Sequence, residues 1–198
     1  MKKILIVSTL VAATAMSAFA QGKVAMQNSS SSPVKLTSDT SLVLAADVTQ
    51  AGTAVGQSAP LLSGKTLVMG LYAGTSSSSL ALFAPRSGDP RGYLMNVTAF
   101  DPGVIASTTY QLAGIAAGPT WLQVKVWDSA FPTFEATPPT AYVGSSPVFQ
   151  FTTGGSVTYP NIAPMLTAPI VVGLVPEPTA AAIAGLGLAS MLIFRRRK

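Results

Sequence analysis

The sequence predicts an all-β protein, an antiparallel β-sandwich of the jelly-roll kind. Its 17 glycines and 15 prolines are scattered without a period and separate short apolar runs. Several of these runs alternate apolar and polar residues, which is the pattern of a strand with one buried face. No segment between the two ends combines helical periodicity with capping residues. Many short strands between Gly/Pro turns are typical of a sandwich, and this length suits about eight to ten strands.

The clearest predicted strand covers residues 121–128. Its apolar positions share one face, which we expect to be buried: Leu122, Val124 and Val126. Its remaining positions share the opposite face: Trp121, Gln123, Lys125 and Trp127. A charge reversal at Lys125 is therefore expected to change stability little, whereas one at Val124 would disrupt the core. Four further strands are predicted, at 42–48, 65–73, 93–100 and 147–152.

The first twenty residues have the organisation of a signal peptide. Lys2 and Lys3 form a basic start, an apolar stretch follows, and Ala18-Phe19-Ala20 is an A-x-A cleavage site. This order predicts recognition by the secretory translocon and removal by a signal peptidase. The mature chain would then begin at Gln21.

The last twenty-four residues form a second, three-part element. Val175, Pro176, Glu177 and Pro178 precede a run of sixteen uncharged residues at 179–194, and Arg195, Arg196, Arg197 and Lys198 follow it. Each proline fixes φ and holds its predecessor extended, so Glu177 is presented on a stiff backbone. The apolar run is slightly short of the ~17 residues of a minimal membrane span, which snorkelling arginines can offset. It is predicted to be a single transmembrane helix with its cations on the cytoplasmic side. A tail anchor that is never cut is the alternative.

This tail resembles the PEP-CTERM sorting signal of exported bacterial proteins. The resemblance implies that an exosortase in the inner membrane recognises Pro176-Glu177-Pro178 and cleaves near it. It also implies an association with exopolysaccharide and biofilm production. A weaker resemblance to the bodies of such proteins implies a shared fold more than a shared chemistry. It rests on residues 22–24 with Asn28, and on 71–74, 123–129, 134–136 and 146–149.

The two ends divide the chain into four parts. We expect a signal peptide at 1–20, a β-sandwich domain at 21–159, a linker at 160–174 and the sorting signal at 175–198. The precursor would reside in the inner membrane, and the processed protein would reach the cell surface or the extracellular space.

Composition excludes several classes of function for the part at 21–175. The whole chain is formally +5 with a pI near 9.7, but the part at 21–175 contains six cations and six anions and is formally neutral. Neutrality gives no electrostatic basis for binding nucleic acid. The chain has no Cys and no His, so thiolate nucleophiles, histidine bases and Cys/His metal sites are excluded. No cofactor is expected.

Two pairs of residues are candidate binding or catalytic groups. Asp128 and Glu135 offer carboxylates for Ca²⁺ or for a glycosidase acid/base pair, and the simpler alternative is a turn cap and a solvated side chain. Trp121 and Trp127 share a strand face and could stack on a sugar, unless they pack against a sheet edge or beneath a loop. We therefore expect a non-enzymatic surface or matrix protein that can meet extracellular polysaccharide. A carbohydrate-binding module or adhesin, and a carboxylate-only glycosidase, are the alternatives.

Overall fold

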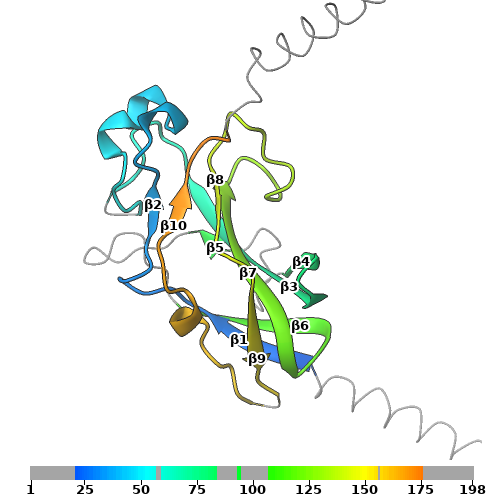
Figure 1. Ribbon diagram of the computed structural model, residues 1–198. Helices are drawn as coiled ribbons and strands as arrows, with labels where there is room; N and C mark the ends of the chain where they lie inside the picture. Colours follow the sequence, from blue (N-terminus) through cyan, green and yellow to red (C-terminus); the bar gives the residue numbers. More distant parts are fainter. Residues whose placement is uncertain (1–20, 57–58, 84–92, 95–106, 156, 176–198) are drawn as a thin grey trace, which may run out of the picture.

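The computed structural model describes residues 21–56, 59–83, 93–94, 107–155 and 157–175 (Figure 1). Within these ranges the chain is mostly β-strand, with three short 3-10 helices, so the all-β prediction is confirmed. None of the described helices is long and apolar enough to span a bilayer. Three predicted features lie outside the described residues: the signal cleavage residues Ala18 and Ala20, the motif and membrane segment at 176–198, and the strand residues 95–100.

The largest sheet has six strands, and β3 and β7 lie at its centre. The central pair is antiparallel and runs in register from Leu67 opposite Asp128 to Gly74 opposite Trp121. The strands of this sheet are β3 (Leu67–Ser76), β4 (Ser79–Phe83), β5 (Tyr93–Leu94), β7 (Gly118–Asp128), β8 (Val143–Ser145) and β9 (Phe149–Thr153). The strands predicted at 65–73, 121–128 and 147–152 are therefore confirmed with small shifts of their ends.

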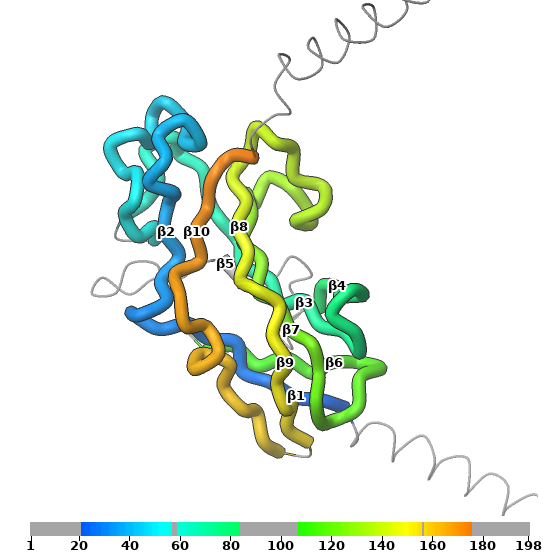
Figure 2. Tube along the Cα trace, in the orientation of Figure 1, coloured from blue at the N-terminus to red at the C-terminus, as the bar shows by residue number. Residues whose placement is uncertain are grey.

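Two small sheets complete the described fold. Strand β1 (Gln21–Met26) pairs antiparallel with β6 (Thr108–Ala116). Strand β2 (Val34–Leu36) pairs parallel with β10 (Ile170–Val172), although 133 residues of chain separate the two strands. Figure 2 shows β1 and β9 at one end of the molecule and β2 and β10 toward the other.

The prediction of a strand at 42–48 is wrong. This region forms the 3-10 helices η1 (Thr40–Leu42) and η2 (Ala45–Gln50). Asp39 begins η1, because its carboxylate accepts a hydrogen bond from the backbone N–H of Ser41 at 2.9 Å. Asp47, the one charged residue of the predicted strand, is completely buried. Local capping and the two hydrogen bonds of buried Asp47 therefore override the apolar, strand-like sequence of 42–48.

The prediction of a linker at 160–174 is also wrong. Ile162, Leu166, Ile170 and Val172 from this segment lie in the main hydrophobic core. The 3-10 helix η3 (Ala163–Met165) and β10 both belong to it. Apolar side chains at alternate positions 170 and 172 are buried while Val171 is exposed, which is the strand pattern in only three residues. A pattern of three residues is too short to be recognised in the sequence, where prolines precede it.

The main core lies on the inner face of the central strands. Leu122, Val124 and Val126 are all 0% exposed there, as the alternation predicts. They belong to the same cluster as apolar side chains of β1, β2, β3, β6 and β10. The three sheets therefore share one hydrophobic interior.

Candidate functional site

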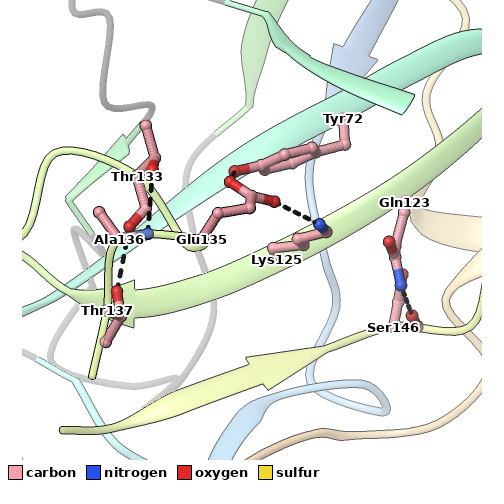
Figure 3. Close-up of polar contacts among 8 residues, drawn as sticks. All are labelled: Tyr72, Gln123, Lys125, Thr133, Glu135, Ala136, Thr137 and Ser146. Atoms are coloured by element: carbon pink, nitrogen blue, oxygen red, sulfur yellow. Dashed lines mark hydrogen bonds and ion pairs between the residues drawn. The ribbon is translucent and has the colours of Figure 1, made fainter. Parts of the chain in front are cut away.

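The outer face of β3 and β7 carries a compact group of charged and aromatic side chains, which we call the outer cluster: Tyr72, Lys125, Phe134 and Glu135. Figure 3 shows Tyr72, Lys125 and Glu135 of this cluster. The ammonium of Lys125 lies 2.7 Å from Glu135 Oε1. The hydroxyl of Tyr72 donates to Glu135 Oε2 at 2.8 Å. Lys125 Nζ also lies 4.0 Å from the centroid of the Tyr72 ring and 4.7 Å from that of Phe134. One cation is thus held by a carboxylate and two rings.

The loop between β7 and β8 supplies half of this cluster. It is stiffened by Thr133, whose Oγ1 accepts from Ala136 N at 3.2 Å and whose carbonyl accepts from Thr137 Oγ1 at 3.0 Å. These contacts are local turn chemistry. They place Glu135 over β7, where the side chain of Lys125 meets it.

Hydrogen bonding keeps Glu135 ionised. Partial burial opposes the charged form, but the bonds from Lys125 and Tyr72 outweigh it, so the pKa of Glu135 lies below its ordinary value. Burial, followed by the bond to Glu135, raises the pKa of Tyr72. Both oxygens of Glu135 have protein partners. The arrangement is therefore suited to fastening the loop rather than to transferring a proton.

Asp128 caps a turn, as the simpler alternative predicts. It is 2% exposed, its Oδ1 accepts from Ala130 N at 3.0 Å, and its Oδ2 lies 3.2 Å from Lys65 Nζ. The matching expectation that Glu135 is simply solvated is wrong. Each of these carboxylates has its own partners. Among the described residues no group of three or more His, Cys, Asp or Glu side chains gathers where it could hold a metal ion.

Of the two alternatives for the tryptophans, Trp127 follows the one in which the ring packs beneath a loop rather than stacking on a sugar. Its indole is 0% exposed and packs with Val68 and Tyr72, and its Nε1 donates to the carbonyl of Phe131 at 3.0 Å. It therefore packs beneath a loop. Gly70 makes this possible, because a Cβ there would lie 2.7 Å from the Trp127 ring. Trp121 remains partly exposed, so a flat surface of two indoles is not formed.

A second polar cluster, which the sequence does not reveal, fastens the 3-10 helices to the domain. Asp47 is completely buried, and its two oxygens accept from Ser63 N at 2.7 Å and from the Tyr142 hydroxyl at 2.8 Å. The Tyr142 oxygen accepts in turn from Leu44 N at 3.0 Å. Burial, followed by the bond to Asp47, raises the pKa of Tyr142. The only sequence signal was a lone acid in the otherwise uncharged stretch 40–64.

Comparison of the chain with family models gives no match. Curated protein sequences and solved structures give none either. Function is therefore inferred from the residues of this chain and from their geometry.

Proposed function

We propose that this chain is an exported, non-enzymatic protein of the cell surface or extracellular matrix, sorted and processed at its C-terminal signal. The observation that carries the proposal is the order of elements at 175–198. A stiff Pro176-Glu177-Pro178 precedes sixteen uncharged residues, and four cations follow them. The A-x-A site at Ala18 and Ala20 supports export.

The delivered part is proposed to be a β-sandwich of the jelly-roll kind. A shared interior between the six-stranded sheet and the two small sheets supports this arrangement. The charged side chains of both polar clusters are used in internal contacts. A neutral domain in which Asp47, Asp128 and Glu135 make internal contacts suits a structural role, and extracellular polysaccharide is its proposed surrounding.

The position of the fold relative to the motif supports processing there. Leu174 N donates to Leu42 O at 2.8 Å, and Val175 N donates to Pro139 O at 3.2 Å. A cut on the C-terminal side of Val175 leaves β10 and every other described strand in place. The proposed partners are an exosortase-type enzyme of the inner membrane, the secretory translocon and signal peptidase.

The test is to replace Pro176-Glu177-Pro178 with three alanines in the full chain, in a host that contains the processing enzyme. The variant is expected to stay in the membrane fraction with its tail attached, because the stiff acidic element is lost while the apolar run remains. Thr179→Ala, which lies next to the motif, is the control and should be released like the wild type. Intact mass of released protein should correspond to a chain that begins at Gln21. Release of the triple-alanine variant at the wild-type level would show that the motif is not the recognition element.

A further inference from the structure

The C-terminal end of the described chain is hydrogen-bonded to the folded domain at each of its last three residues. Gly173 and Val143 exchange two backbone hydrogen bonds of 3.0 Å, and the bonds of Leu174 and Val175 to Leu42 and Pro139 follow directly. The backbone is therefore held by the fold up to Val175. Val175, the last residue that the fold holds, is therefore also the first residue of the proposed sorting signal.

Only three residues, 176–178, separate Val175 from the uncharged run. An extended residue spans at most about 3.6 Å, so these three reach about 10 Å. The polar layer on each side of a bilayer is itself roughly 5–8 Å thick, since about 30 Å of a 40–45 Å bilayer is hydrocarbon. If the uncharged run at 179–194 enters the hydrocarbon, the surface around Val175 must therefore lie close to the membrane.

The surface around Val175 is built from the described residues of three segments, 40–64 (without 57–58), 136–142 and 166–175, which we call the exit end. They are joined by the Asp47–Tyr142 bond, by the Leu44–Tyr142 bond and by the Leu42–Leu174 bond. The sequence of these three segments contains one charged residue, Asp47, and it is buried; the residues that flank them, Asp39, Lys65 and Glu135, are charged and exposed. Exposed apolar side chains are present there at Val48, Leu62 and Val175, which are 39%, 62% and 44% exposed.

Segments without an exposed charge can approach lipid without removing an ion from water, which would be costly. They also contain no Lys or Arg that could attract anionic headgroups. Contact between the exit end and the membrane would depend on residues 176–178, which act as a short tether, and on the exposed apolar side chains.

We propose that the exit end rests on the membrane surface in the anchored precursor, with Val48, Leu62 and Val175 in the headgroup layer. The partner is the lipid surface itself, and neutral lipid suffices. This orientation rests on the proposed function, because it requires the run at 179–194 to be a membrane anchor. It places the opposite end of the domain, with β1 and β9, away from the membrane (Figure 2).

The chain contains no cysteine, so a single introduced thiol can be labelled at a chosen place. Val48→Cys reports on the exit end. Val157→Cys is the matched control, since Val157 is 83% exposed and follows Gly154, which exchanges hydrogen bonds with Lys23 of β1. Each full-length variant is labelled with an environment-sensitive fluorophore and reconstituted into phosphatidylcholine vesicles. Far-UV circular dichroism checks that both variants are folded, and flotation checks that they are anchored.

Lipid carrying a headgroup quencher is expected to reduce the fluorescence at position 48 strongly and at position 157 hardly at all. A flexible insert of about 20 Gly and Ser residues after Val175, which spans about 25 Å, should bring position 48 down to the level of position 157. Equal quenching at both positions in a chain that floats would overturn the orientation and leave the anchor intact. Unchanged quenching at position 48 with the insert would overturn the role of the tether. A chain that does not float would remove the anchor, and the orientation with it.

Discussion

Consecutive residues of β7 experience different surroundings on the two faces of the sheet. Val124 is 0% exposed in the main core, while the Lys125 side chain keeps 16% exposure on the outer face. The outer face is nevertheless packed, because the loop that carries Phe134 and Glu135 covers it. The expectation that Lys125 tolerates charge reversal must therefore be revised.

Val124→Asp is expected to prevent folding of the chain 21–175, because it buries a carboxylate without a partner. Lys125→Asp should lower the free energy of unfolding by about 1–2 kcal/mol, because it loses the cation–π contacts and faces Glu135 with a like charge. Urea denaturation followed by circular dichroism measures both. Lys125→Met, which keeps the apolar stem, is the control and should lie between Lys125→Asp and the wild type. A change below about 0.5 kcal/mol for Lys125→Asp would show that the outer cluster contributes nothing to stability.

Two tyrosine hydroxyls that both bond a carboxylate should differ in importance. Tyr142→Phe leaves one oxygen of the buried Asp47 without its donor and is expected to cost about 2–3 kcal/mol. Tyr72→Phe removes a bond to Glu135, whose side chain is 57% exposed, so water replaces the hydroxyl and the cost should stay below about 1 kcal/mol. Denaturation midpoints of the two variants give the comparison. Equal losses would argue against burial as the deciding factor.

At the scale of elements, β10 is the strand whose role the sequence hides most completely. It is three residues long, pairs parallel with β2, and exchanges hydrogen bonds with the beginning of β8 through Gly173. Ile170 and Val172 are 1% and 0% exposed. Strand β10 therefore completes the core between β2 and β8, which are distant from each other in the sequence.

The chain 21–159, which ends where a linker was expected, should fail to fold as a unit. It lacks Ile162, Leu166, Ile170 and Val172, which are all buried in the main core, and losing one large buried aliphatic side chain already costs about 2–5 kcal/mol. The chain 21–175 retains them and is the matched control. Thermal unfolding of both, followed by near-UV circular dichroism, decides the matter. A cooperative transition of similar midpoint in the shorter chain would restore the linker interpretation.

At the scale of the whole molecule, stability should fall at both extremes of pH. The pKa of Glu135 is lowered from 4.5, so its contribution is present above about pH 4.5 and is lost as the pH falls below that value. The pKa values of Tyr72 and Tyr142 are raised from 10.0, so their contribution is present below pH 10 and is lost as the pH rises above it. Urea midpoints of the chain 21–175 across pH measure the loss of stability at low pH and at high pH. Glu135→Gln should reduce the loss at low pH, and Tyr142→Phe should reduce the loss at high pH. Losses that these substitutions leave unchanged would assign the pH dependence to other groups.

The strands that the sequence predicts well are those with long alternation. Strand β7 carries three apolar residues at alternate positions beside Gln123 and Lys125, and its inner face is buried as expected. Strand β3 is equally clear because its first eight residues, Leu67 to Gly74, carry no charge and are all buried. Period-two burial is a local property, so a single stretch of sequence is enough to reveal it.

By itself, the sequence determined the all-β class, the buried face of β7 and the neutral charge of the part at 21–175. These follow from composition and from spacings within ten residues. Only the tertiary structure decided that Trp127 packs against Val68 and Tyr72 of β3, that Asp47 is bonded by Tyr142 and that β10 joins β2. The physical reason is the same in each case. The partner lies on another segment of the chain, 95 residues away for Asp47, and burial or pairing at such distances depends on how the elements pack rather than on any local pattern.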